Sequence, residues 1–286
     1  MASAGSRGAV VITGASTGIG YASALHLASL GFEVFAGVRR DADAERLRAA
    51  GDGRIEPLHI DVTDGASIGA AVERVGEAVD GGRLAGLVNN AGIAVPGPIE
   101  FIPVDEFRRQ IEVNLVGQMA VTQAFLPLLR RSRGRIVNIG SIGGRVALPL
   151  LGPYAASKHA MEGLSDSLRR ELRPAGIEVS LIRPGPIATE IWERGNTTAD
   201  ELLERMPGVE EHYGPAIAAS RAWASERAGE AIPPSVVAAV VGDALTADKP
   251  RTRYLVGPRA KLMVRLRELL PDRWFDALIE RMARRG

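Results

Sequence analysis

The sequence predicts an α/β fold with a doubly wound parallel sheet, built as a single domain. Short apolar runs alternate with longer segments of helical periodicity through the first two thirds of the 286 residues. Some of the runs, such as Gly86–Val88, are apolar throughout, which suits strands that are buried on both faces. The first run leads into a glycine-rich turn and then into a helical pattern, the usual start of such a sheet.

The individual elements follow from apolar spacing and from the residues that end each run. Strands are predicted at Ala9–Thr13, Glu33–Val38, Arg54–Ile60, Leu84–Val88, Arg135–Gly140, Glu178–Ile182 and Arg253–Val256. Helices between them are predicted at Ile19–Leu30, Ser67–Val79, Val104–Arg131 and Tyr154–Arg173, among others. No repeat or low-complexity linker divides the chain, so one domain is expected over residues 1–286.

Two late segments depart from the alternating pattern. Charges, Gly and Pro interrupt a partly helical sequence at residues 190–234, and an insertion here is typical of a lid over the ligand crevice. Residues 258–286 form a basic, amphipathic C-terminal helical extension. Such a tail can lie on a membrane surface, or it can pack on the lid or on a second subunit. We expect it to pack on protein rather than on a membrane.

Composition limits the classes of function. Apolar residues make up 46% of the chain and charged residues 24%, and a formal net charge of +1 gives no general attraction to nucleic acid. The lack of cysteine excludes disulfides and thiolate chemistry, and the four histidines show no metal-ligand spacing, so no metal is expected. No segment reads as a secretory signal or a membrane span, which predicts a cytoplasmic protein.

The turn after the first strand has the residues of a phosphate-binding loop. Glycines let the backbone turn sharply and leave N–H groups at a helix start open to an anion, to which hydroxyl groups can add donors. Such a turn can also merely connect a strand to a helix, but its place at the first strand–helix junction favours a dinucleotide site. The candidate contacts are Gly14, Ser16, Thr17, Gly18, Ile19 and Gly20.

Tyr154 and Lys158 form a candidate acid–base pair, since residues at i and i+4 share one helix face. An unperturbed tyrosine has a pKa of about 10, and a neighbouring ammonium is expected to lower the pKa of Tyr154 toward a useful range. Ser141 follows a strand at the carboxyl edge of the sheet, where its hydroxyl can polarise a substrate carbonyl. A tyrosine and a lysine four residues apart are more commonly a pair on a helix surface. The neighbouring motifs must therefore decide whether this pair is catalytic.

Taken together, the motifs resemble those of the short-chain dehydrogenase/reductase family, in its steroid and retinol dehydrogenase branch. The TGxxxGIG loop at Thr13 is similar to the family's cofactor loop, and further motifs follow in the family's order up to about residue 190. These are Asp61-Val62, Asn89-Asn90-Ala91-Gly92, Asn114, Ser141, Tyr154-Ala155-Ala156-Ser157-Lys158 and Pro184-Gly185-Pro186-Ile187-Ala188-Thr189. The resemblance implies a Rossmann-like fold and an NAD(P)-dependent oxidoreductase that interconverts an alcohol and a ketone or aldehyde by hydride transfer.

The resemblance also implies roles for four candidate catalytic residues. Tyr154 would exchange a proton with the substrate oxygen beside Ser141, Lys158 would also bind the nicotinamide ribose, and Asn114 would hold a water in a proton relay. The remaining candidate cofactor contacts are Arg39, Asp61, Val62, Asn90, Ala91, Gly92, Tyr154, Lys158, Pro184, Gly185, Ile187 and Thr189. Relatives that are catalytically silent dinucleotide sensors or scaffolds typically lack the tyrosine or lysine, so an enzyme is the preferred interpretation.

The end of the second strand predicts NADP as cofactor, with NAD as the alternative. A dehydrogenase that uses NAD usually has a carboxylate there for the ribose diol, whereas this chain has Val38 followed by Arg39. An arginine can pair with a 2′-phosphate through a charge-assisted fork. Arg39 and Arg40 are also explained as solvated charges, and NADP-preferring relatives often have a basic loop residue where this chain has Thr17.

The candidate substrate pocket is mostly apolar, which suits a hydrophobic alcohol or ketone, although the same residues can serve as core. Its members are Ile142, Gly143, Leu148, Leu151, Pro186, Ile191 and Trp192. The long helices Val104–Arg131 and Tyr154–Arg173 are expected to form the shared face of a homodimer or homotetramer, unless the chain itself covers them.

Overall fold

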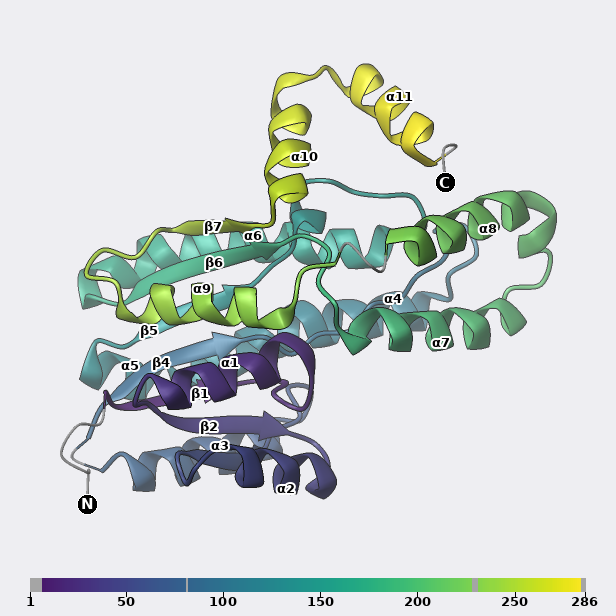
Figure 1. Cartoon of the computed structure of the whole chain (residues 1–286). Helices are drawn as coiled ribbons and strands as arrows, with labels where there is room; N and C mark the ends of the chain where they lie inside the picture. Colours follow the sequence, from purple (N-terminus) through teal and green to yellow (C-terminus); the bar gives the residue numbers. More distant parts are fainter. Residues whose placement is uncertain (1–6, 81, 228–230, 284–286) are drawn as a thin grey trace.

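A seven-stranded, wholly parallel sheet in the order β3-β2-β1-β4-β5-β6-β7 confirms the predicted fold class (Figure 1). The structure is a computed structural model, and it describes residues 7–80, 82–227 and 231–283. Every predicted strand is present, with ends that agree within two residues. The strands are β1 (Ala9–Ile12), β2 (Glu33–Val38), β3 (Ile55–His59), β4 (Leu84–Asn89), β5 (Arg135–Ile139), β6 (Glu178–Pro184) and β7 (Arg253–Val256).

The strand order reverses between β1 and β4, so the chain winds outward from the middle of the sheet in both directions. In open parallel sheets the loops at the carboxyl ends diverge at this reversal and leave a crevice for a ligand. The loops that follow β1, β4, β5 and β6 therefore meet at one edge, and these loops contain most of the motifs found in the sequence.

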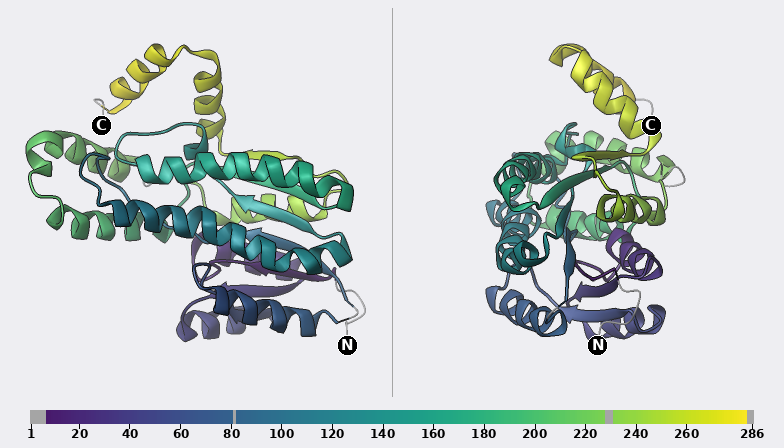
Figure 2. Two further views of the ribbon diagram at one scale, coloured as in Figure 1. Left: turned by 180° about the vertical axis from the view of Figure 1, so that it is seen from behind. Right: turned by 90° about the vertical axis from the view of Figure 1, so that its left-hand side faces the viewer.

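Helices cover both faces of the sheet (Figure 2). Successive strand residues point to opposite faces: Val10 and Ile12 belong to one buried cluster, and Ala9 and Val11 to the other. This two-sided burial explains the uninterrupted apolar strands. One face carries α1 (Gly18–Ser29), α2 (Asp41–Ala50) and α9 (Pro234–Thr246), and the other carries α3 (Gly65–Ala78), α4 (Val104–Ile111), α5 (Gly117–Ser132) and α6 (Gly152–Leu172).

The segment predicted as one regular helix, Val104–Arg131, differs from the prediction in its middle. Here α4 continues into a π-helical stretch, Glu112–Val116, before α5 begins. A π-helical insertion rotates the following side chains relative to an ideal helix and is frequent at functional sites. Asn114 lies within this stretch and is 1% exposed.

A buried ion pair fixes α6 against the sheet. The Arg183 guanidinium on β6 donates to both carboxylate oxygens of Glu162 on α6, at 2.5 and 2.6 Å. Arg253 on β7 adds contacts to Glu162 at 3.4 Å and to Asp166 at 2.7 Å. Because α6 carries Tyr154 and Lys158, this network sets their position relative to the last two strands.

The predicted lid segment contains α7 (Glu190–Glu204) and α8 (Val209–Arg227), which stand beyond the carboxyl edge of the sheet (Figure 1). A small core made by Val95, Ile102, Leu202, Met206 and Val209 attaches both helices to the chain that follows β4. Arg205 adds ion pairs to the start of α4, at 3.0 Å to Asp105 and 2.8 Å to Glu106.

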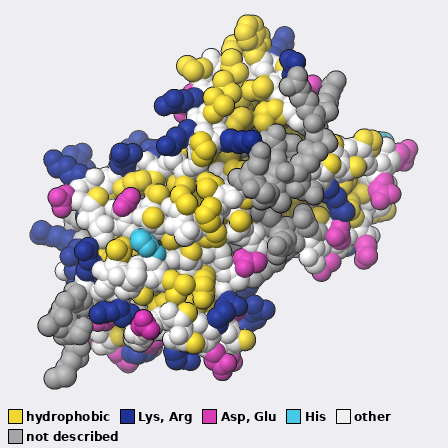
Figure 3. Space-filling model, viewed as in Figure 1, with side chains coloured by type: hydrophobic (Ala, Val, Ile, Leu, Met, Phe, Trp, Pro, Cys, Tyr) yellow, Lys and Arg dark blue, Asp and Glu magenta, His cyan; other side chains and the backbone are white. Residues whose placement is uncertain are grey.

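The C-terminal extension is helical, with α10 (Pro258–Leu269) and α11 (Asp272–Ala283) projecting from the body of the molecule (Figures 1 and 2). Helix α11 approaches α8, and Phe275 is buried beside Arg267. Leu262, Leu269 and Trp274 are 56%, 79% and 70% exposed, and Figure 3 shows apolar atoms across this projection. Among the described helices, none combines the length and apolarity needed to span a membrane.

Candidate active site

The four candidate catalytic residues converge at the carboxyl end of β5, although they lie on separate elements. Ser141 follows β5 and begins a short 3-10 turn, Ile142–Gly144, while Tyr154 and Lys158 lie in the first half of α6. Asn114 reaches the same region from the π-helical stretch. All four side chains are buried, with residue exposures between 1% and 9%.

Tyr154, Ser141 and Lys158 form a compact group. Ser141 donates a hydrogen bond to the Tyr154 phenol and accepts one from the Gly143 backbone N–H at 2.9 Å. Lys158 donates to the carbonyl of Ile139, the last residue of β5, at 2.9 Å, and its Nζ is 5.8 Å from the Tyr154 ring centre. The backbone of β5 therefore orients the lysine, and the serine orients the phenol.

The pKa of Tyr154 does not shift in the direction that the sequence predicted. Burial raises the pKa of the phenol above 10.0, and the hydrogen bond from Ser141 opposes that rise. Burial also lowers the pKa of Lys158 from 10.5 to about 8. The expectation that the pKa of Tyr154 is lowered is wrong here because desolvation by burial is the largest influence on the phenol. The Lys158 ammonium bonds to the Ile139 carbonyl.

Asn114 connects the loop after β4 to α6. Its Oδ1 accepts from the Ile93 N–H at 2.8 Å, and its Nδ2 donates to the Ile93 carbonyl at 3.0 Å and to Ser157 Oγ at 3.2 Å. Both donor protons of Nδ2 are engaged, so this side chain could bind a relay water only through the second acceptor site of Oδ1, and the backbone of the π-helical stretch offers further groups. There the regular hydrogen-bond ladder is interrupted.

Sequence reasoning missed two glutamines that act with Asn114. Gln110 accepts from the Val95 N–H at 2.7 Å and donates to the Ile93 carbonyl at 2.8 Å, and Gln118 donates to the Ala91 carbonyl. The three amides recur every four residues along one helical stretch, so they hold successive backbone groups of the same loop. This recurrence was the available signal, and all three residues are buried.

The glycine-rich loop has the backbone geometry that an anion site requires. Gly14 and Gly18 adopt φ of +63° and +55°, which side chains disfavour. A Cβ on Gly14 would lie 2.7 Å from Ala91 Cα, and one on Gly18 would lie 2.8 Å from Thr189 Cγ2. Helix α1 starts without a side-chain cap at Thr17, so its first N–H groups keep their capacity for an anion.

Neighbouring loops are tied to this glycine-rich loop. Asn90 Nδ2 donates to the carbonyls of Thr13 and Gly14, both at 2.9 Å, and the buried Thr13 hydroxyl accepts from the N–H groups of Asn90 and Ala91 at 2.9 and 3.0 Å. Gly92 lies close to Asn114 in space, because a Cβ added to Gly92 would be 3.3 Å from Asn114 Oδ1. The Asn-Asn-Ala-Gly motif thus sets the distance between the loops after β1 and β4.

The loop after β6 completes this side of the crevice. Pro184 ends the strand, and the Gly185 N–H donates to the Val256 carbonyl at 2.9 Å. Ile187 is buried, and Thr189 leads into α7 against Gly18.

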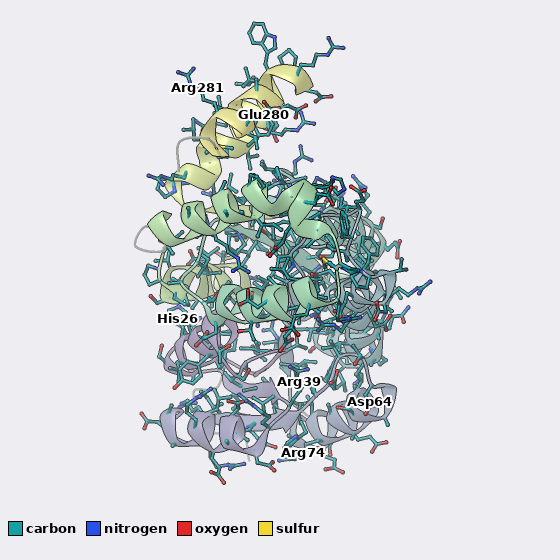
Figure 4. The ribbon with its side chains drawn as sticks, turned by 90° about the vertical axis from the view of Figure 1, so that its right-hand side faces the viewer. His26, Arg39, Asp64, Arg74, Glu280 and Arg281 are labelled. Carbon is teal, nitrogen blue, oxygen red and sulfur yellow. The ribbon has the colours of Figure 1, made fainter. Side chains whose placement is uncertain are left out.

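The predicted adenosine end lies at the carboxyl ends of β2 and β3, where Figure 4 shows Arg39 and Asp64. A hollow of about 170 Å³ is lined there by Val38, Arg39, His59, Ile60, Asp61, Asp64 and Ser67. The Arg39 guanidinium is 3.9 Å from the Asp61 carboxylate, and its side chain is 66% exposed. Val62, next to Asp61, is buried against Gly117.

These observations fit a nicotinamide dinucleotide. The glycine-rich loop and the uncapped start of α1 suit its pyrophosphate, the hollow at β2 and β3 suits its adenosine, and the loops after β4 and β6 lead toward Tyr154. The apolar candidates Ile142, Leu148, Leu151 and Ile191 are partly buried, whereas Pro186 is exposed. The side chain of Trp192 lies outside the described part of the structure. No cluster of metal-binding side chains occurs among the described residues.

Comparison with known proteins identifies the family. Residues 8–200 match the model of the short chain dehydrogenase family. The chain is 37% identical to the NADPH-dependent 3-dehydrocapnine reductase of Ornithobacterium rhinotracheale, with 94% of each chain covered. It is 39% identical to human retinol dehydrogenase 16, with 94% of this chain and 87% of the relative covered.

Solved structures agree with this assignment. A short-chain dehydrogenase/reductase of Burkholderia phymatum in complex with NAD superposes with a TM-score of 0.77 at 28% identity, covering 92% of this chain and 94% of that one. The chain therefore belongs to the short-chain dehydrogenase/reductase family. It is a nicotinamide-dependent oxidoreductase that acts on CH–OH groups and their carbonyl counterparts.

The depressed pKa of Lys158 makes a stability prediction. Holding a buried ammonium costs up to about 3 kcal/mol below pH 8, given a pKa of about 8 in the folded chain against 10.5 when unperturbed. Lys158→Met removes this cost and loses one hydrogen bond, of about 1 kcal/mol. We expect the variant to be about 1–2 kcal/mol more stable than the parent at pH 7 by urea unfolding.

The sign of the pH dependence provides the check. Between pH 8 and 10.5 the unfolded chain binds more protons at Lys158 than the folded chain does, so the parent gains stability as pH rises. The advantage of Lys158→Met should therefore shrink over that interval. A difference that stays constant from pH 7 to 10 would contradict the assigned pKa.

Proposed function

We propose that this enzyme reduces a hydrophobic ketone or aldehyde with NADPH, with Tyr154 as the proton donor to the substrate oxygen. The single observation that carries this role is the buried Tyr154 phenol, hydrogen-bonded to Ser141 and with Lys158 Nζ 5.8 Å from its ring centre. A phenol with a raised pKa keeps its proton at neutral pH, and the neutral form is the one that protonates a carbonyl oxygen. The same residue takes the proton back when the alcohol is oxidised, so the proposed direction follows from the reduced cofactor, NADPH, and not from Tyr154.

The neighbouring residues divide the remaining work. Ser141 lies beside the phenol, and its hydroxyl proton, which points to Tyr154, can turn to the substrate oxygen when a substrate is bound. Lys158 offers its ammonium to the nicotinamide ribose and a positive charge near the phenol after proton transfer. Asn114 connects the π-helical stretch to the loop after β4 and to α6. A relay water would bind at this stretch. When bound, the reduced nicotinamide supplies the hydride.

The candidate cofactor contacts support the phosphorylated dinucleotide. Val38 leaves no carboxylate to repel a 2′-phosphate, and Arg39 is mostly exposed at the rim of the adenosine hollow. The name of the reductase from Ornithobacterium rhinotracheale states NADPH dependence. NAD remains the alternative cofactor.

Residues 190–234 act as the substrate lid in this proposal, and residues 258–286 as a helical extension that supports it. The lid is apolar where it meets the chain after β4, through Leu202, Met206 and Val209. Retinol dehydrogenase 16, one of the relatives, is named for a hydrophobic alcohol. An apolar alcohol or ketone therefore fits this chain better than a charged sugar.

The second candidate function, a catalytically silent sensor or scaffold, is the less favoured one. Tyr154, Lys158, Ser141 and Asn114 are all present and mutually oriented, which a silent relative would not need. We also propose that the enzyme works in the cytoplasm, with which a cysteine-free sequence is compatible.

The proton-donor role predicts that Tyr154→Phe lowers turnover about 10²- to 10⁴-fold, because only the acid is removed. NADPH binding, measured by its fluorescence, should change little, since the ring stays in place. Tyr254→Phe, which removes a hydroxyl bonded to the Arg251 N–H away from the site, is the matched control. Near-parental turnover by Tyr154→Phe would exclude Tyr154 as the acid.

The cofactor assignment predicts a higher kcat/KM with NADPH than with NADH in a screen against apolar ketones and aldehydes. Arg39→Ala should lower kcat/KM for NADPH about 10- to 100-fold, because it removes a charge-assisted contact, and leave NADH nearly unaffected. A parent enzyme that prefers NADH would refute the assignment. If the protein neither oxidises nor reduces any compound in the screen, the catalytically silent sensor would become the favoured function.

An exposed apolar face predicts a homodimer, or a homotetramer built from it. Val104, Phe107, Val116 and Met119 along α4, the π-helical stretch and α5 are 62%, 38%, 37% and 37% exposed. Burying such a face against a second copy is favourable. Met119→Glu should therefore give monomers by light scattering. Val236→Glu, at a 41% exposed site on α9, should not. A monomeric parent would refute the proposal.

A further inference from the structure

Arg46 on α2 contacts the glycine-rich loop, although 30 residues separate it from Ser16 in the sequence. Its Nη2 donates to the carbonyl of Ser16, and its guanidinium carbon is 5.5 Å from the ring centre of Tyr21. Ser16 and Tyr21 lie on either side of Thr17 in the sequence. The guanidinium therefore contacts residues on both sides of position 17, the loop position that lacks a basic residue.

Asp43 holds this arginine in place. Its Oδ1 accepts from Arg46 Nη2 at 3.0 Å, and its Oδ2 accepts from Arg40 Nε at 2.8 Å. The carboxylate is 5% exposed, whereas the Arg46 side chain is 50% exposed. A guanidinium has five N–H donors, so the half that faces solvent retains the capacity to bind another anion.

The surroundings indicate which anion that would be. The Ala15 N–H donates to the Gly37 carbonyl at 2.7 Å, so the glycine-rich loop and the end of β2 are directly adjacent. Arg39 follows β2 at this junction, and Arg46 donates to the carbonyl of Ser16, the residue after Ala15. In a Rossmann-type site the adenosine ribose lies at the end of β2, beside the first loop. A phosphate on the ribose 2′-oxygen would meet arginines from two elements of the chain.

We propose that Arg46 is a second residue that reads the 2′-phosphate of NADP, supplying from α2 the cation that the loop lacks at Thr17. The proposal rests on the NADPH preference put forward above. Asp43 acts as a positioning residue, because its buried carboxylate fixes the direction of the Arg46 fork. The stacking of Arg46 on Tyr21 further limits its motion.

The test compares Arg46→Gln with Arg48→Gln, a control at an exposed arginine on the same helix. Dissociation constants for NADPH and NADH are measured by fluorescence on the full chain. Those for adenosine 2′,5′-bisphosphate and 5′-AMP are measured by calorimetry, which requires no turnover. Arg46→Gln should weaken NADPH and the bisphosphate about 10- to 100-fold, with NADH and 5′-AMP changed less than about threefold. Arg48→Gln should change none of the four.

Each other outcome is informative. Equal weakening of phosphorylated and unphosphorylated ligands would mean that Arg46 only supports the loop, and would overturn the inference. Unchanged dissociation constants for all four ligands would also overturn the inference. In either case, a preference of the parent enzyme for NADPH would leave the proposed function intact. A parent that prefers NADH would instead refute the cofactor proposal and the inference with it. Arg46→Lys, which keeps the charge without the fork, should fall between parent and Arg46→Gln.

Discussion

The active centre depends on burying one face of α6 against the end of β5, because that contact desolvates an ammonium and a phenol together. Lys158 is 6% exposed, and its Nζ is anchored on the Ile139 carbonyl. Burial lowers the pKa of the lysine to about 8 and raises that of Tyr154. At neutral pH only the lysine shift is a cost to the folded chain, because the phenol is neutral in both the folded and the unfolded state. The Glu162–Arg183 pair and the sheet hold the helix in place despite this cost.

A second constraint is the loop after β4, which has little regular structure of its own. Three buried amides hold it: Gln110, Asn114 and Gln118 bond in turn to Val95, Ile93 and Ala91. The π-helical stretch lies in the middle of this series and sets how Asn114 faces Ser157. Because Asn90 bonds back to the glycine-rich loop, the same series connects the dinucleotide side of the crevice to the helix that carries Tyr154.

The two ends of the crevice differ in chemistry. The Tyr154 end is buried, which favours a neutral phenol. The end near β2 is open and is lined by the exposed Arg39. Exposed arginines in water provide selectivity through paired hydrogen bonds rather than through bulk attraction, consistent with a net charge of only +1.

The sequence by itself determined the sheet, since apolar runs bounded by glycines and charges located all seven strands within two residues. It also indicated the family, because Gly14, Asn90, Ser141, Tyr154 and Lys158 recur in a fixed order. Tertiary structure decided what depends on distance. The sign of the Tyr154 pKa shift follows from the burial of the phenol, which an i, i+4 spacing does not reveal. In the same way, only the tertiary structure brings Arg46 of α2 to the carbonyl of Ser16, which the motif of the loop does not reveal.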